Sequence, residues 1–387
     1  MDIAIVGAKR SPIGTLMGGL SPLAASAIGA QVIEATLTHA GLDADQIDEV
    51  MLGQILTAAT GQGPARQAAR QAGIPDSATA LSINQLCGSG LRAVALGAQQ
   101  IMTGQAEIVL AGGQESMSRA PHAQALRGGQ KLGNLELIDT MMHDGLTDAF
   151  YGYPMGITAE NIAERWQISR EAQDAFALES QSRAASALSD AKFAAELTPI
   201  RIETRKGVTE VSTDEFPRPQ TSAQSLAGLR PAFKKDGSVT AGNASGINDG
   251  AAVLALMAAD QVEGREVLAK IVSFATAGVA PEIMGTGPIP ASQLALKRAG
   301  WGIDQLDLIE SNEAFAAQSL CVIQELGLDP AKVNVNGGAI ALGHPIGASG
   351  ARVLVTLIHA LRARGGGRGL ATLCIGGGMG VAMCIEV

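Results

Sequence analysis

The sequence AGLDADQIDEV at residues 40–50 returns as AGWGIDQLDLI at residues 299–309, and SGLR at residues 89–92 returns as SGAR at residues 349–352. The members of the two pairs are 259 and 260 positions apart, so the copies keep nearly the same spacing. Self-similarity at a fixed spacing indicates an internal duplication. We therefore expect two halves of similar fold, related by approximate symmetry.

Each half alternates strand-like and helix-like segments. Residues 78–84 and 108–113 predict strands, and the apolar positions between 91 and 102 fall on one helical face. Residues 353–358 are apolar on every side, which indicates a helix buried between other layers. Duplicated α/β halves with helices between their sheets predict a five-layer αβαβα stack.

A stretch of different composition separates the halves. Residues 120–244 are rich in proline and glycine breaks and predict an inserted loop domain, in which Ser169 is placed to cap a helix. We expect residues 1–119 with 245–268 to form the first half and residues 269–387 the second. Residues 369–385 predict two buried strands joined by a glycine turn.

Composition excludes several classes of protein. The chain has 387 residues, 47% of them apolar and 3% aromatic, so its core must consist of small and aliphatic side chains. A net charge of −9 argues against nonspecific nucleic-acid binding, and no uncharged stretch reaches the ~20 apolar residues that span a bilayer. The acidic start, Met1-Asp2, predicts no secretory signal and a cytoplasmic location. Four cysteines and five scattered histidines, with no Cys-x-x-Cys pair, predict neither a disulfide framework nor a metal site.

One basic stretch stands out on this acidic chain. Residues 201–235 hold four acids and seven bases, the bases being Arg201, Arg205, Lys206, Arg218, Arg230, Lys234 and Lys235. This local excess suits a phosphorylated ligand, or it is an ordinary solvated face.

Two motifs at equivalent strand-to-helix junctions carry candidate catalytic groups. In Asn84-Gln85-Leu86-Cys87-Gly88-Ser89-Gly90, the thiol of Cys87 stands where a helix dipole favours a thiolate, although a cysteine in such surroundings is often a small buried hydrophobe. In Gly343-His344-Pro345-Ile346-Gly347, the histidine precedes the buried helix of the second half. If equivalent helix ends meet at a pseudo-twofold axis, His344 reaches Cys87 and activates it. A purely structural role for the histidine is the alternative.

Two further motifs are weaker by themselves. Cys374-Ile375-Gly376-Gly377-Gly378 places a cysteine at a strand end, followed by backbone with free N–H groups. It offers a proton-transfer group and an oxyanion contact. In Ser311-Asn312-Glu313-Ala314-Phe315, the amide of Asn312 is suited to holding a water.

Together these four blocks, in this order and spacing, resemble the signature blocks of the thiolase family. The similarity runs from Ile5 to the C-terminus and is greatest to the short-chain, biosynthetic acetoacetyl-CoA thiolases. It implies the five-layer thiolase-like fold and an acyltransferase that makes or breaks 3-ketoacyl-CoA. Acyl-CoA and CoA are then substrates, no cofactor is needed, and the enzyme is a homodimer or homotetramer.

The resemblance also implies roles for individual residues. Cys87 becomes the acylated nucleophile, His344 its activating base, and Cys374 the group that removes and returns the α-proton. The N–H groups of Cys87 and Gly376 form one oxyanion hole, and His344 with a water on Asn312 forms the other. The remaining residues are implied to contact CoA or the acyl chain: Arg218, Ser225 and Ser245 along CoA, and Met155, Phe233, Met284 and Phe315 along the tunnel. As apolar residues, the last four are equally compatible with ordinary core.

One position departs from the short-chain pattern. Pro154 stands where these thiolases typically have histidine, and Pro154-Met155-Gly156 looks more like thiolases of longer chains. We therefore expect a wider acyl tunnel, and a broader 3-ketoacyl-CoA thiolase of β-oxidation is the alternative. A ketoacyl synthase is disfavoured because its second catalytic histidine is not recognisable. A non-catalytic lipid-binding relative should have lost one of the four blocks, and none is lost.

Overall fold

The computed structural model describes residues 2–205 and 207–387, and within them the two halves repeat one strand arrangement. Four neighbouring strands of the first half have counterparts in the second, in the same order and with the same parallel and antiparallel pairings. The pairs are β3 (Glu49–Gly53) with β12 (Leu308–Ser311), β5 (Ile108–Ser116) with β13 (Arg368–Ile375), β10 (Asn248–Ala258) with β14 (Met379–Glu386), and β1 (Ile3–Arg10) with β11 (Ala269–Gly278). The internal duplication is confirmed.

The two groups of strands are joined at β1. This strand pairs with β10 along its length and with β11 over Ile3–Ile5, so the described residues form one ten-stranded sheet. The sequence predicted separate sheets, and it missed that a single strand can serve as an edge of both. β4 (Thr79–Ile83) extends the first half, whereas the second half has only a single bridge between Ile309 and Val333 at the matching place.

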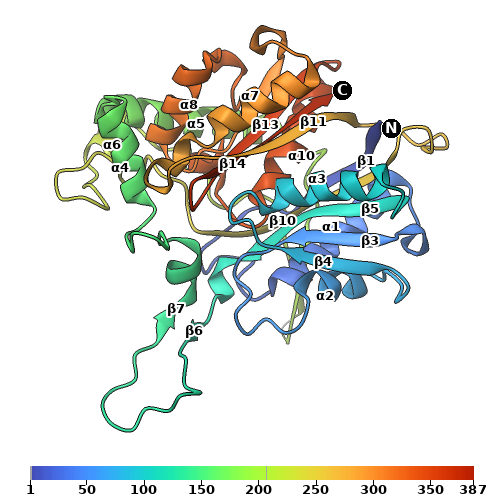
Figure 1. Ribbon diagram of the computed structural model, residues 1–387, viewed down its shortest axis with the longest axis horizontal. Helices are drawn as coiled ribbons and strands as arrows, with labels where there is room; N and C mark the ends of the chain where they lie inside the picture. Colours follow the sequence, from blue (N-terminus) through green and yellow to red (C-terminus); the bar gives the residue numbers. More distant parts are fainter. Residues whose placement is uncertain (1, 206) are drawn as a thin grey trace.

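Two helices lie between the halves of this sheet. α3 (Ser89–Met102) and α10 (Ser349–Ala363) share one aliphatic core with both groups of strands. Figure 1 shows the two helices between the strands of the first half and those of the second. Their first turns meet at Gly90 and Gly350. A Cβ on Gly90 would lie 2.7 Å from the Ala351 nitrogen, and one on Gly350 would lie 2.3 Å from the Leu91 nitrogen. The equivalent helix ends therefore meet at the centre of the molecule, as the duplication predicted.

Outer helices complete the five layers. α1 (Ala25–Ala40) and α2 (Pro64–Gln71) cover the outer face of the first half, and α7 (Pro288–Ala299) and α8 (Ala316–Leu326) cover the second. The predicted order of αβαβα layers is confirmed.

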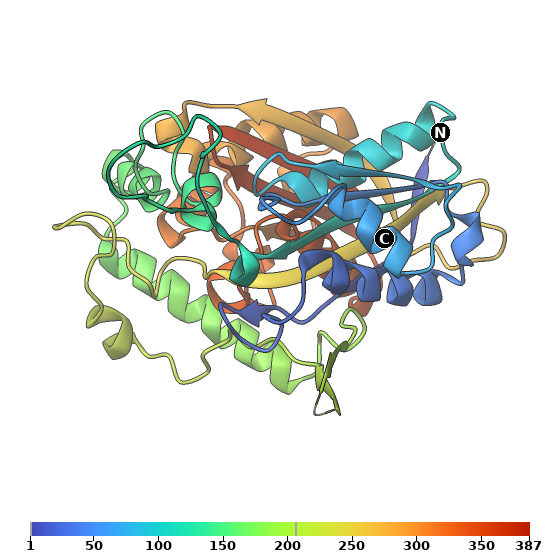
Figure 2. The same cartoon turned by 90° about the horizontal axis from the view of Figure 1, so that it is seen from below.

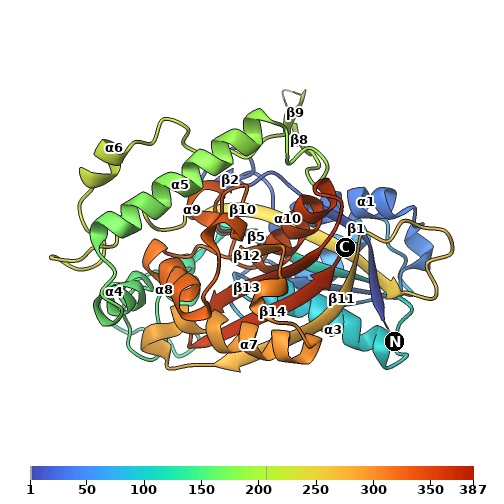
Figure 3. The same cartoon turned by 90° about the horizontal axis from the view of Figure 1, so that it is seen from above.

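The segment between the halves lies along one side of this stack. It contains α4 (Gly156–Arg165), α5 (Arg170–Ser189), α6 (Ala223–Ala227) and the two small sheets β6–β7 (His122–Ala123, Ile138–Asp139) and β8–β9 (Ile200–Thr204, Gly207–Val211). Ser169 caps α5 by accepting the Ala172 N–H, as predicted. The long helix α5 packs against α8 and α9 (Ala339–Leu342), which are labelled with it in Figure 3. In Figure 2 it is the long green helix along one side of the molecule. The short β2 (Gly14–Thr15) pairs with β10.

A buried charge network ties this segment to the core. The Arg10 guanidinium of β1 bonds both oxygens of Asp214, at 2.7 and 3.0 Å, and also bonds Glu196. Thr356 of α10 donates to the same Glu196. These bonds satisfy an otherwise costly buried charge and fix the segment against both halves. Among the helices of the described residues, none is long and apolar enough to cross a membrane.

Candidate active site

Residues from both halves and from the inserted segment surround one apolar cavity of about 610 Å³. The cavity receives the two cysteines and the histidine that the sequence singled out. Its lining includes Cys87, His344, Cys374 and Gly376, together with Met155, Ser245, Met284 and Phe315.

Cys87 sits in a braced turn, one residue before the Gly88 N-cap of α3. Leu86 adopts a left-handed conformation with φ of 46°, which is unusual for a residue with a side chain. The side chain of Ser89 holds this turn. Its Oγ accepts the Gln85 N–H at 2.8 Å and donates to the Leu86 carbonyl at 2.6 Å. The thiol is thereby presented to the cavity at a fixed place.

Burial governs the charge state of this thiol. Desolvation raises the pKa of Cys87 to about 11, while hydrogen bonds from the Gly376 and Cys87 N–H groups act in the opposite direction. The sequence predicted a thiolate favoured by the helix end, and in the resting protein that effect is outweighed. Cys87 therefore rests as a thiol and needs a base to become a nucleophile.

His344 lines the same cavity as Cys87. Its backbone N–H donates to Asn248 Oδ1 at 2.8 Å, and its Nδ1 lies 2.6 Å from Ser349 Oγ. Burial, and then the charge of Arg352, lowers the pKa of His344 to about 3, so the imidazole is neutral. Its Nε2 is buried and has no partner among the described residues. One ring nitrogen is thus held and the other is available for chemistry.

Cys374 reaches the cavity from the end of β13. Burial, and then the proximity of Cys87, raises the pKa of Cys374 above the usual range of a thiol. The glycine turn that follows joins β13 to β14, as predicted, with φ of 76° at Gly377 and 84° at Gly378. Gly376 begins this turn and directs its N–H at Cys87.

Asn312 lies behind the cavity rather than in its lining. Its N–H donates to the Thr372 carbonyl at 3.0 Å, which fixes it beside β13. Both atoms of its side-chain amide are buried without a partner among the described residues. A buried amide of this kind is suited to binding an ordered water.

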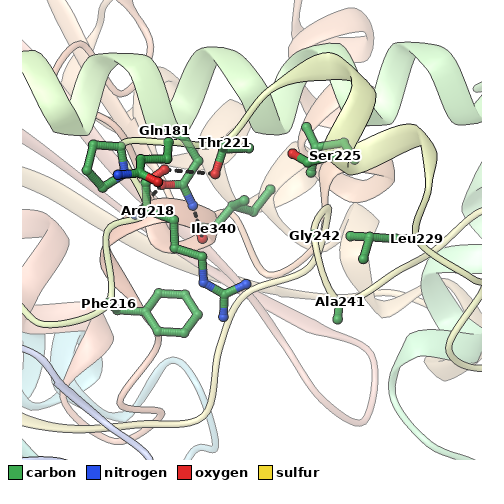
Figure 4. A pocket seen from close by; sticks show the side chains of 12 residues that line it. Gln181, Phe216, Arg218, Thr221, Ser225, Leu229, Ala241, Gly242 and Ile340 are labelled. Atoms are coloured by element: carbon green, nitrogen blue, oxygen red, sulfur yellow. Dashed lines mark hydrogen bonds between the residues drawn. The ribbon is translucent and has the colours of Figure 1, made fainter.

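A second cavity, of about 490 Å³, contains Arg218 and Ser225. The Arg218 guanidinium lies over the Phe216 ring, 5.1 Å from its centroid, and points into the pocket in Figure 4. Ala241 and Gly242 line this cavity and Ser245 lines the first, so residues 241–245 connect the two. Of the described bases between 201 and 235, Arg218 alone lines the cavity, and Lys206 lies outside the described residues.

Comparison with known proteins identifies the family. Residues 3–260 match the family model for the thiolase N-terminal domain, and residues 265–387 match that for the thiolase C-terminal domain. The chain belongs to the thiolase family. It is 58% identical over 387 residues to the acetyl-CoA acetyltransferase of Rhizobium meliloti, covering 100% of this chain and 98% of that protein. It is also 58% identical over 384 residues to that of Shinella zoogloeoides, with coverage of 99% and 98%.

A solved structure shows the same fold. The crystal structure of the Bacillus anthracis acetyl-CoA acetyltransferase superposes with a TM-score of 0.98 at 46% identity, covering 100% of this chain and 98% of that one. The thiolase fold expected from the sequence is confirmed.

Two predicted tunnel residues of this thiolase do not line the cavity. Phe233 lies behind it, edge-on to Phe315 with ring centroids 6.3 Å apart. Pro154 is exposed and absent from the lining, whereas the next residue, Met155, takes part. The effect of this proline on the width of the acyl tunnel stays a prediction.

One buried acid of this thiolase, Glu115, was not predicted from the sequence. Glu115, at the end of β5, accepts the N–H groups of Ile55, Leu56 and Gly347 at 3.0, 3.3 and 3.0 Å. It joins a loop of the first half to the turn that carries His344. Burial raises the pKa of Glu115 to about 7, although these three donors oppose the shift. The available signal was a lone acid closing an otherwise uncharged strand.

The described residues contain no group of three or more His, Cys, Asp or Glu side chains that could hold a metal ion.

Proposed function

We propose that this thiolase is an acetyl-CoA C-acetyltransferase. It joins two acetyl-CoA molecules into acetoacetyl-CoA and free CoA, and it catalyses the reverse thiolysis. CoA is a substrate, and no metal or other cofactor takes part. The observation that carries the proposal is the convergence of Cys87, His344 and Cys374 on one apolar cavity. The acetyl-CoA acetyltransferases that resemble the whole chain support the choice of substrate.

In the first half-reaction, Cys87 takes the acetyl group. Nε2 of His344 accepts the thiol proton as the sulfur attacks the thioester carbon of acetyl-CoA. The bond to the CoA sulfur breaks, and Cys374 gives its proton to the departing thiolate. The raised pKa of Cys374, which comes from burial and then from Cys87, keeps it protonated for this step. The acetyl-enzyme then holds a Cys374 thiolate and a protonated His344.

In the second half-reaction, the Cys374 thiolate removes an α-proton from the second acetyl-CoA. The resulting enolate carbon attacks the acetyl carbon on Cys87, and the carbon–sulfur bond to Cys87 breaks. The released thiolate regains its proton from His344. All three groups return to their starting states, so the proton balance closes without an external donor.

Two sets of donors stabilise the oxygens that become negative. The N–H groups of Cys87 and Gly376 face the Cys87 sulfur and form an oxyanion hole for the acetyl carbonyl. His344, with a water held by Asn312, serves the enolate oxygen. One such donor is typically worth ~3 kcal/mol in a site that excludes water.

The CoA molecule occupies both cavities. Its nucleotide lies in the second cavity, where Arg218 faces phosphate or adenine and Ser225 stands at the rim. The pantetheine arm passes Ser245 toward Cys87, and Met155, Met284 and Phe315 contact the acyl end. Phe233 supports this wall from behind.

The setting of the enzyme is part of the proposal. We place it in the cytoplasm, in fatty acid metabolism, as a homodimer or homotetramer. Exposed apolar side chains support assembly, among them Leu81 on the edge strand β4 and Leu132 and Leu135 in the loop between β6 and β7.

A broader 3-ketoacyl-CoA thiolase is the second candidate, favoured by the Pro154-Met155-Gly156 run and by the apolar cavity. Thiolysis of 3-ketoacyl-CoA substrates of four to twelve carbons separates the two. We expect the highest kcat/KM for acetoacetyl-CoA and a steep fall beyond it. A flat profile would support the broader enzyme, and binding without turnover would refute both.

A further inference from the structure

Two serines occupy equivalent places in the duplicated halves, each beside a candidate catalytic group. Ser89 is the first residue of α3 and Ser349 the first of α10, and both are 0% exposed. Each hydroxyl makes two hydrogen bonds within its own turn. This repetition points to a role beyond filling space.

The contacts of Ser349 determine which nitrogen of His344 carries hydrogen. Ser349 Oγ donates to the Pro345 carbonyl at 2.9 Å and lies 2.6 Å from His344 Nδ1. A hydroxyl has a single hydrogen to donate, and a carbonyl oxygen accepts hydrogen bonds but cannot donate one. With the hydroxyl hydrogen on the Pro345 carbonyl, Nδ1 carries its own hydrogen and donates it to Oγ. That leaves Nε2 of the neutral ring with its lone pair free for the Cys87 proton.

The same arrangement serves the protonated ring. When Nε2 gains a proton, the chain from Nδ1 through Ser349 Oγ to the Pro345 carbonyl stays as it is. The reverse arrangement, with the hydroxyl donating to Nδ1, would have to rotate at each protonation. A site that needs no reorganisation during the reaction lowers its barrier most.

Ser89 holds the turn that carries Cys87. It accepts from Gln85 and donates to Leu86, and Leu86 has the left-handed φ of 46°. A conformation of this kind persists only where its surroundings hold it. The two bonds of Ser89 therefore hold the turn that aims Cys87 into the cavity.

We propose that Ser349 and Ser89 are a duplicated pair of positioning residues, in which Ser349 sets the tautomer of His344 and Ser89 fixes the turn of Cys87. The inference rests on the proposed roles of Cys87 and His344. It assigns the two serines no contact with substrate.

The test combines a tautomer measurement with kinetics. Protein labelled with 15N-histidine is examined by NMR at neutral pH, and His344→Gln identifies the signals of this ring among the five histidines. In the wild type we expect a protonated Nδ1 and an unprotonated Nε2. Ser349→Ala should mix the two tautomers and lower kcat by about 10²-fold, since catalytic groups held loosely or in the wrong tautomer lose at least this much. KM should stay within a few-fold.

Three comparisons isolate the effect. Ser89→Ala should lower kcat but leave the His344 tautomer unchanged, and Ser349→Thr, which keeps the hydroxyl, should restore the tautomer. Ser273→Ala is the matched control, because Ser273 of β11 has a buried hydroxyl that donates to the Ala295 carbonyl of α7 at 2.7 Å. It should change neither kcat nor the tautomer.

The outcomes separate this inference from the proposed function. A wild-type ring protonated on Nε2 would overturn the role of Ser349, and that spectrum requires no variant to fold. A kcat of Ser349→Ala or Ser89→Ala within twofold of the control would overturn the role of that serine. The expected tautomer and its loss in Ser349→Ala, in a wild type without thiolase turnover, would refute the function while supporting the role of Ser349.

Discussion

Replacing Gly90 by alanine tests whether the meeting of α3 and α10 positions the catalytic groups. The new Cβ would lie 2.7 Å from the Ala351 nitrogen and 3.2 Å from the Gly347 and Ala348 oxygens. These are backbone atoms and cannot swing aside. Ordinary contact begins at ~3.5 Å, so the two helix ends must separate by about 0.8 Å.

This separation has two effects of different size. Overpacking costs about 1–3 kcal/mol, and the better helix propensity of alanine recovers about 1 kcal/mol, so the loss of stability is modest. Cys87 and His344 stand at the ends that move, and a displacement near 1 Å costs about 10²-fold in rate. We expect kcat for acetoacetyl-CoA thiolysis to fall by that factor, while urea unfolding shifts only slightly.

Gly97→Ala is the matched control in the same helix. Its Cβ would meet the Val109 and Leu256 side chains at 3.0 and 3.1 Å, and these can yield. Gly97→Ala should lose a similar amount of stability and keep its kcat. Equal kcat values for Gly90→Ala and Gly97→Ala would refute the argument that this contact sets the catalytic geometry.

Three other outcomes follow from the site. Cys374→Ser should slow thiolysis and condensation strongly while Cys87 still accepts an acetyl group, and near-normal thiolysis would make Cys374 structural. Arg218→Ala should raise KM for acetyl-CoA about tenfold and leave KM unchanged for acetyl thioesters that lack the nucleotide. An equal rise in KM for both kinds of substrate would show that Arg218 does not contact the nucleotide. Burial raises the pKa of Glu115 to about 7, so its contribution to stability is full below pH ~4.5 and is lost as pH rises through about 7. Glu115→Gln should reduce this fall in the free energy of unfolding, measured with urea, by at most ~3 kcal/mol. If the wild type and the variant lose stability in parallel as pH rises, the raised pKa of Glu115 is contradicted.

The duplication was predictable because it is written in local sequence. The matching pairs at 40–50 and 299–309, and at 89–92 and 349–352, predicted equivalent helices and strands in the two halves. They also predicted that Cys87 and His344 lie near one axis of approximate symmetry. The glycine turn after Cys374 and the cap at Ser169 were also predictable, since each depends on a few neighbouring residues.

Features set by long-range packing were not predictable in this way. The pKa of Cys87 rises because segments distant in sequence exclude water from it, and a helix end alone indicated the opposite direction. Pro154 points outward because of the path of its loop, and β1 joins both halves because it pairs on each side. Glu115 accepts three N–H groups from loops distant in sequence, and its place as a lone acid at a strand end does not reveal these partners.

The acetyl group on the enzyme is the most direct test of the central claim. The protein is incubated with acetyl-CoA, quenched in acid and digested, and the peptides are analysed by mass spectrometry. We expect one acetyl group on the peptide that contains Cys87, and its removal when free CoA is added before the quench. An acetyl group on Cys374 instead, or turnover with no acetyl group on Cys87, would contradict it.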